Sequence, residues 1–140
     1  MGEKVLVAYD GSLVSKKAIR EAQIQLSGPT GKELHIISVI TKGISKNHSG
    51  SQMDLAEDFK RLLKNLAEEY ATGKFSVTTD VSIDYSERNA GYQICEYAND
   101  HGIDLIIVGN RGLEGIKKVF LGSVSENVIQ HAPCPVIIMK

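Results

Sequence analysis

Apolar runs alternate along this chain with segments of helical periodicity. Val5–Ala8 and Leu105–Val108 are apolar without interruption, as expected of strands that are buried on both faces of a sheet. Leu34–Ile40 and Val136–Met139 are two further runs that are mainly apolar. Phe75–Ile83 alternates apolar with polar residues, which predicts a half-exposed edge strand. The pattern therefore predicts five strands.

The segments between these runs have the periodicity of amphipathic helices. We expect Ser12 and Ser123 to cap the first and the fourth helix, and His101-Gly102 to end the third. The polar stretch Thr41–Gln52, before the second helix, predicts a loop. The apolar stripes that indicate the four helices are Ala18, Ile19, Ala22 and Leu26; Leu55, Phe59, Leu62, Leu63, Leu66 and Tyr70; Ile94, Cys95 and Ala98; and Val124, Val128 and Ile129.

Strands and helices that alternate in this way are typical of a parallel α/β sheet. Right-handed crossovers, with the two uninterrupted apolar strands at the centre, favour the strand order 3-2-1-4-5 of a Rossmann-like fold. The length of 140 residues fits one domain, residues 1–140, and we find no internal repeat, linker or low-complexity tract.

Composition and charge narrow the range of partners. A net charge of −1 gives no electrostatic reason to expect a nucleic acid or an anionic membrane. No apolar run approaches the roughly 20 residues of a membrane span, and the N-terminus lacks the pattern of a signal peptide. Two distant cysteines predict no disulfide framework, and four scattered histidines predict no transition-metal site. We therefore expect a cytoplasmic protein.

Ligands of a doubly wound sheet bind at the carboxyl ends of the strands, where the winding reverses. In the predicted order this point lies between the first and the fourth strand, and Asp10 follows the first. Asp10 can accept hydrogen bonds from ribose hydroxyls or an adenine amino group, or it can form an Asx turn that caps the next helix. Its position favours contact with a ligand.

A glycine-rich stretch follows the fourth strand, from Gly109 to Ser125. Gly109, Gly112 and Gly115 allow the backbone to approach a ligand closely. The start of the fourth helix offers free N–H groups and a positive dipole end, and the hydroxyls of Ser123 and Ser125 could add donors. This spacing favours a phosphate-binding loop over the alternative, a glycine turn followed by an ordinary N-cap.

The residues give no reason to expect catalysis. No Ser/His/Asp arrangement can be placed together, and no carboxylate pair stands near the switch point. Cys134, between two prolines, is more typical of a packing residue than of a reactive thiol. Arg111 could neutralise phosphate charge, whereas Lys117 and Lys118 are better interpreted as solvated surface charges.

Four motifs make the chain resemble the universal stress protein family over essentially its whole length. The spacing Gly109-x2-Gly112-x9-Gly122-Ser123 matches the ATP-binding motif of that family without a gap. The tail GSVSENVIQHAPCPVIIM is very similar to the family's C-terminus. VLVAYDGS and ICEYANDHGIDLIIVG match its other blocks.

The resemblance implies a three-layer sandwich of the adenine nucleotide alpha hydrolase-like type, usually a homodimer, that binds ATP with Mg²⁺ and hydrolyses it slowly at most. One departure is that Arg88 and Ala90 stand where the family commonly has Gly and Pro, which leaves that side of the pocket undefined. The implied nucleotide contacts are Ala8, Tyr9, Asp10 and Val39 on the adenosine side, and Gly109, Asn110, Arg111, Gly112, Gly122, Ser123, Val124 and Ser125 on the phosphate side.

The leading hypothesis is an ATP-binding stress-response or signalling module that responds to nucleotide through Thr41–Gln52. One alternative is an enzyme of the related nucleotide hydrolase superfamily. The lack of a second domain and of an evident substrate pocket argues against it. Another is a nucleotide-free dimeric scaffold, against which the intact glycine motif speaks. Val136–Met139 is apolar on both faces although it should be an edge, which predicts an antiparallel dimer through this strand.

Overall fold

The computed structural model describes residues 4–28, 31–41, 52–71, 73–84, 89–110 and 123–140. In these ranges apolar runs form strands and amphipathic segments form helices, as the sequence pattern predicts. The elements in chain order are β1 Lys4–Ala8, α1 Leu13–Gln25, β2 Lys32–Ile40, α3 Gln52–Tyr70, β3 Phe75–Ile83, α4 Ala90–His101, β4 Leu105–Gly109, α5 Ser123–His131 and β5 Val136–Met139.

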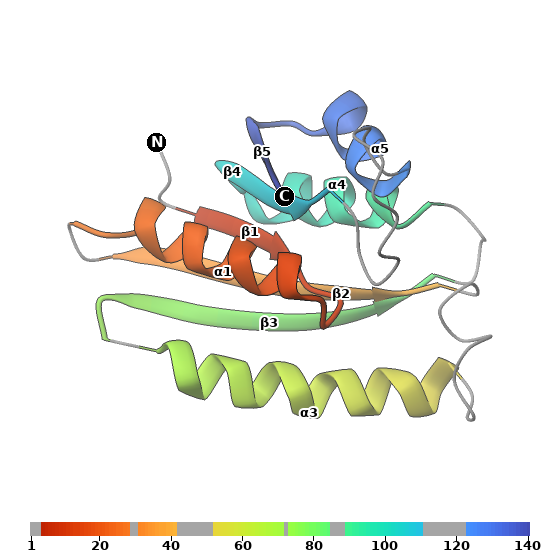
Figure 1. Cartoon of the computed structure of the whole chain (residues 1–140), viewed down its shortest axis with the longest axis horizontal. Coiled ribbons are helices and arrows are strands. Elements are labelled where there is room, and N and C mark those ends of the chain that lie inside the picture. Colours follow the sequence, from red (N-terminus) through yellow and green to blue (C-terminus); the bar gives the residue numbers. More distant parts are fainter. Residues whose placement is uncertain (1–3, 29–30, 42–51, 72, 85–88, 111–122) are drawn as a thin grey trace.

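The strands form one parallel sheet in the order β3-β2-β1-β4-β5, which confirms the predicted order 3-2-1-4-5. Helices α1 and α3 cover one face of this sheet, and α4 and α5 cover the other (Figure 1). The result is the three-layer arrangement expected of a doubly wound fold.

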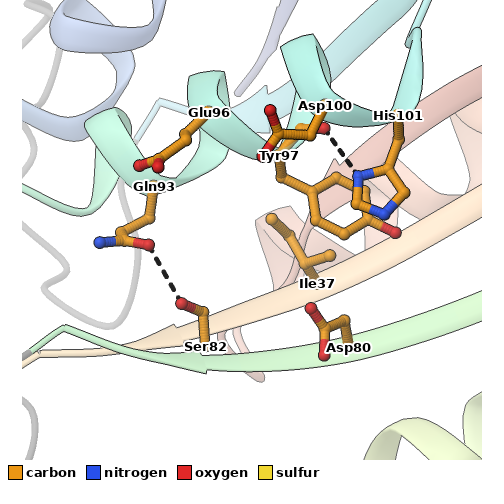
Figure 2. A pocket seen from close by; sticks show the side chains of 8 residues that line it. All are labelled: Ile37, Asp80, Ser82, Gln93, Glu96, Tyr97, Asp100 and His101. Atoms are coloured by element: carbon orange, nitrogen blue, oxygen red, sulfur yellow. Dashed lines mark hydrogen bonds between the residues drawn. The ribbon is translucent and has the colours of Figure 1, made fainter.

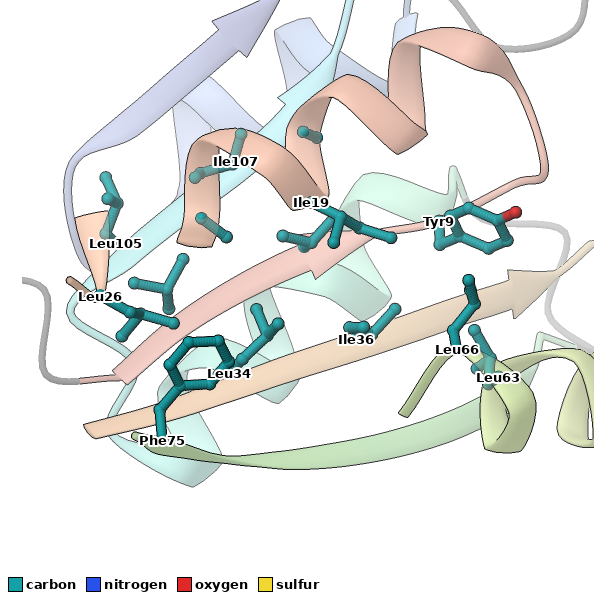
Figure 3. Packing of buried hydrophobic residues seen from close by; sticks show 14 residues of the cluster. Tyr9, Ile19, Leu26, Leu34, Ile36, Leu63, Leu66, Phe75, Leu105 and Ile107 are labelled. Carbon is teal, nitrogen blue, oxygen red and sulfur yellow. The ribbon is translucent and has the colours of Figure 1, made fainter. Parts of the chain in front are cut away.

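Each face of the sheet carries its own core, because successive residues of a strand point to opposite faces. Val5 and Val7 of β1 pack with Ile19 of α1 and Leu63 of α3 in the first core, shown in Figure 3. Leu6 of β1 packs on the other face in a second core, with Ile94 and Ala98 of α4 and Val128 of α5. Strand β1 is therefore buried on both faces, as its uninterrupted apolar run predicts.

The helix ends agree with the expected signals at two places and differ at two others. Ser12 caps α1, and its Oγ accepts a hydrogen bond from the backbone N–H of Ser15 at 3.1 Å. Gly102 ends α4 in the left-handed conformation, with φ of 63°. Ser123, expected as the cap of the last helix, is instead the first residue of α5. Gln52, expected in the preceding loop, is likewise the first residue of α3.

Replacing Gly102 with Ala should lower the free energy of unfolding by about 1 kcal/mol, because a Cβ disfavours the left-handed conformation. A Cβ built at Gly102 would meet no atom within 4 Å, so the cost comes from the backbone alone. Urea denaturation measures this change. Gly102→Asn should lose less, since Asn tolerates this conformation. Equal losses for the two variants would contradict the explanation.

The two edges of the sheet differ in polarity. Ser76, Thr78 and Asp80 of β3 are exposed, which confirms the prediction of a half-exposed edge strand. At the opposite edge, all of β5 is apolar and partly buried. Among the described residues, no helix has both the length and the apolar character that crossing a membrane requires.

Candidate functional site

The winding of the sheet reverses between β1 and β4, which lie side by side. Val7 of β1 pairs with Ile36 of β2 on one side and with Ile107 of β4 on the other. The carboxyl ends of β1 and β4 therefore lie next to each other, and Asp10 and Asn110 follow these two ends. This is the edge at which doubly wound sheets bind ligands.

Asp10 forms an Asx turn at the end of β1. Its Oδ1 accepts a hydrogen bond from the backbone N–H of Ser12 at 2.9 Å. Ser12 in turn caps α1, so the carboxylate and the start of the helix are held in one arrangement. The Asx turn, one of the two roles expected for Asp10, is therefore observed. Asp10 also remains partly exposed at the carboxyl edge of the sheet, where a ligand is expected.

Tyr9 anchors the end of β1. The residue is 4% exposed, and its side chain lies in the first core, on the α1 and α3 face (Figure 3). Its backbone N–H donates to the Ile37 carbonyl at 2.8 Å, and its carbonyl accepts from Ser38 Oγ at 2.6 Å. Burial, with a smaller contribution from Asp10, raises the pKa of the Tyr9 phenol. Tyr9 therefore fixes the strand end from the face opposite Ala8.

Three of the predicted nucleotide contacts lie on the same face of the sheet. Ala8 of β1, Val39 of β2 and Val124 of α5 all pack against the second core, and all three keep part of their surface exposed. They come from three elements that are far apart in the sequence. Together they provide an apolar, partly exposed surface beside the carboxyl ends of the strands.

Ser125 joins the first turn of α5 to the end of β4. Ser125 is 1% exposed. Its Oγ donates to the Gly109 carbonyl at 2.7 Å and lies 3.4 Å from the Asn110 carbonyl. Ser123, two residues earlier, is exposed. The hydroxyl of Ser125 thus positions the start of the helix, whose first backbone N–H groups have no acceptor within the helix.

Asn110 carries a buried acceptor next to this helix start. Its backbone N–H donates to the Met139 carbonyl at 2.7 Å, which fixes the residue at the end of the sheet. Its side-chain Oδ1 is buried and has no hydrogen-bond partner in the part of the chain that the structure describes. A buried acceptor without a partner is costly, so a donor from a bound molecule would be favourable here.

A close contact between α4 and α5, next to this site, was not predicted from the sequence. A Cβ built on Gly91, in the first turn of α4, would lie 2.7 Å from Asn127 Cβ and 3.0 Å from the Val124 carbonyl. Gly91 therefore lets α4 approach α5 at the turn that carries Val124. A glycine inside a helical pattern was the only signal for such an approach.

The remaining predicted residues fall into two groups. Ala90 is the first residue of α4, and Cys134 packs against the second core, where burial raises the pKa of its thiol. Cys134 is thus the packing residue that we expected. Seven of these residues lie outside the described part of the chain, as do 42–51 of the predicted loop: Arg88, Arg111, Gly112, Gly115, Lys117, Lys118 and Gly122. Within the described ranges no group of three or more His, Cys, Asp and Glu side chains could hold a metal ion.

The chain is similar to proteins of one family over its whole length. The model of the universal stress protein family matches residues 1–140. The universal stress protein YxiE of Bacillus subtilis is 30% identical over 153 residues, with 100% of both chains covered. The solved structure of the hypothetical protein MJ0577, described as a structure-based assignment of biochemical function, superposes with a TM-score of 0.84 at 26% identity, covering 100% of this chain and 96% of that one.

Two further solved structures with this fold contain a nucleotide. One is a universal stress protein in complex with cAMP, with a TM-score of 0.70 and 23% identity over 98% of this chain and 96% of that one. The other, from Archaeoglobus fulgidus, is in complex with dAMP, with a TM-score of 0.66 and 19% identity over 98% and 97%.

Proposed function

The chain belongs to the universal stress protein family, and we propose that it binds ATP at the carboxyl edge of its sheet as a nucleotide-responsive stress or signalling module. The adenine would lie on the apolar surface of Ala8, Val39 and Val124. The phosphates would lie at the start of α5, where free N–H groups and the helix dipole favour negative charge.

The observation that carries this proposal is the position of α5. The bond from Ser125 Oγ to the Gly109 carbonyl holds the first turn of the helix at the end of β4. The same turn carries Val124, which packs with Ala8 and Val39 against one core. An anion-binding helix start and an apolar surface are therefore adjacent, and this combination suits an adenine nucleotide.

The chemistry of the edge fits the rest of the nucleotide. Asn110 Oδ1, which has no hydrogen-bond partner among the described residues, could accept a hydrogen bond from a ribose hydroxyl or from water bound to Mg²⁺. Asp10 lies at the neighbouring strand end with one oxygen in the Asx turn. Bound Mg²⁺ would neutralise phosphate charge, and its ligands would be phosphate oxygens and water with few protein groups.

The related structures support an adenine nucleotide without fixing its phosphates. Two proteins with the same fold were solved with cAMP and with dAMP. Support for a triphosphate comes from the glycine spacing that runs from Gly109 to Ser123. We propose ATP on that basis, with binding rather than turnover as the function, and we place it in the cytoplasm, which is rich in ATP. The two free cysteines suit that reducing compartment.

Isothermal titration calorimetry of the whole chain with ATP, with and without Mg²⁺, tests the proposal. Saturable binding of one nucleotide per chain is expected, and ATP should bind more tightly than AMP because the helix start interacts with the additional phosphates. Absence of saturable binding at millimolar ATP would sink the proposal. Equal affinities for ATP and AMP would contradict the proposed position of the phosphates at the start of α5.

We further propose an antiparallel dimer through β5. This strand is at the edge of the sheet and presents apolar, partly exposed residues along its whole length. An apolar edge with unpaired backbone groups favours pairing with a second chain. Light scattering at micromolar concentration should therefore give twice the chain mass, and a monomer mass would count against this dimer.

A further inference from the structure

A polar cluster lies where the carboxyl-terminal end of α4 packs on β2. It consists of Glu33 and His35 from β2 and Tyr97 and His101 from α4. The His35 side chain is only 5% exposed. Its Nδ1 is 2.7 Å from the Tyr97 hydroxyl and its Nε2 is 3.1 Å from Glu33 Oε1. A buried imidazole thus connects a carboxylate to a phenol across two elements.

The two hydrogen bonds define where the proton of the neutral His35 ring resides. A carboxylate only accepts, so Nε2 carries the hydrogen and donates it to Glu33. Nδ1 then has a lone pair and accepts the hydrogen of the Tyr97 hydroxyl. A single ring proton therefore satisfies both contacts, and the neutral ring suits its buried position.

Other charged and titratable groups surround this ring on each neighbouring element. The ring centroids of His35 and His101 are 5.8 Å apart, and His101 stacks on Tyr97 with a centroid distance of 3.8 Å. From β1, Lys4 Nζ lies 3.7 Å from Glu33 Oε2 and 3.4 Å from the His101 carbonyl. Burial raises the pKa of the Tyr97 phenol to about 12, and the carboxylate of Asp80 on β3 contributes to this increase. A positive charge on His35 would thus be disfavoured by Lys4 and His101. It would be favoured by the carboxylate of Glu33, which is in contact with the ring.

Tyr97 and His101 also form part of the wall of a cavity of about 210 Å³ between α4 and the strands β2 and β3 (Figure 2). A hydrogen bond from Ser82 Oγ to Gln93 Oε1, at 3.1 Å, joins α4 to β3 near its other end. The end of α4 that carries Tyr97 is held on β2 by the His35 contact together with the packing of Ala98 in the second core.

We propose that Glu33, His35 and Tyr97 form a proton-sensitive latch that holds the end of α4 on β2, and that protonation of His35 releases it. A proton on Nδ1 turns this acceptor into a donor that points at the Tyr97 hydroxyl. The phenol hydrogen must then rotate away from Nδ1. The added charge is also poorly solvated in its buried position, so the contact between the two elements weakens.

The sign of the pH effect follows from the environment of the ring. Burial lowers the pKa of His35, and the hydrogen bond to Glu33 offsets part of this decrease. Below the ordinary histidine pKa of about 6.5, the unfolded or released segment therefore takes up a proton that the latched state does not. The latch is stable above this pH and weakens as the pH falls.

Hydrogen exchange of the α4 backbone amides tests the latch in the intact chain. Protection factors, which correct for the intrinsic pH dependence of exchange, should fall about tenfold for Ala98 and His101 when the pH is lowered from about 7.5 to about 5.5. The released state takes up one more proton than the latched state, so opening becomes about tenfold more favourable for each pH unit below a pKa of about 6.5. An unchanged protection factor at both residues would overturn the proposal.

His35→Gln separates the latch from general acid effects, because Gln keeps a donor and an acceptor but cannot be protonated. Its protection factors should be the same at both pH values. The matched control is His131→Gln, at an exposed histidine of α5, which should keep the normal tenfold fall. A fall that persists in His35→Gln would overturn the latch. Should that variant not fold, NMR titration of the unaltered chain decides, since a His35 pKa at or above 6.5 contradicts the latch.

Discussion

Replacing Ser123 with Asp should weaken ATP binding by about 100-fold and leave the stability of the ligand-free chain unchanged or slightly higher. Ser123 is exposed and is the first residue of α5. A carboxylate in the first turn of a helix is favourable by roughly 0.3–1 kcal/mol. The same charge next to a phosphate is unfavourable by about 4 kcal/mol at 4 Å near a protein surface. Screening by salt and water leaves roughly 3 kcal/mol, or about 100-fold in affinity.

Ser123→Asn is the matched control for this variant. Asn has nearly the shape of Asp but carries no charge, so its ATP affinity should remain within a few-fold of that of the unaltered chain. Calorimetric titration with ATP and thermal unfolding without ATP give the two quantities. An Asp variant that binds ATP as tightly as the Asn variant would place the phosphates elsewhere.

Replacing Ile19 with Ala should lower the free energy of unfolding by about 2–5 kcal/mol. The Ile19 side chain is completely buried in the first core, between α1 and the sheet (Figure 3). Its truncation removes apolar contacts and leaves a cavity that rigid neighbours fill only in part. This is a large fraction of the 5–15 kcal/mol that stabilises a typical domain.

The same helix provides the control for the Ile19 substitution. Ile24 is 64% exposed, so Ile24→Ala should change the stability by less than about 0.5 kcal/mol. Both variants make the same chemical change in α1, and urea denaturation compares them directly. Similar losses for Ile19→Ala and Ile24→Ala would mean that the first core does not carry the stability of the fold.

The fold could be predicted from the sequence because its main determinants are local and periodic. The alternation in Phe75–Ile83 reports one exposed face, and the uninterrupted apolar runs of β1 and β4 report burial on both faces. Right-handed crossovers then leave few arrangements of the strands. The predicted ends of the elements were less accurate. Ser123, expected as a cap, is helical, because the start of a helix depends on tertiary contacts.

The site could be predicted only at the level of which strand ends come together. The strand order places Ala8 and Val39 near each other, and the motif spacing adds Val124. The bond from Ser125 to the Gly109 carbonyl depends on the angle at which α5 packs, which no local pattern encodes. The same limit applies to His35 and Tyr97. They are 62 residues apart in the sequence, so the 2.7 Å contact between His35 Nδ1 and the Tyr97 hydroxyl could not be predicted.

The unequal polarity of the two sheet edges has a consequence for how large an assembly can grow. Pairing of β5 with the β5 of a second chain is a two-fold contact in which each partner uses the same surface, and it closes after two chains. Pairing of β5 with β3 would instead continue head to tail without limit. Exposed Ser76, Thr78 and Asp80 make β3 a poor template for that growth. We therefore expect the polar edge at β3 to disfavour the growth of fibres.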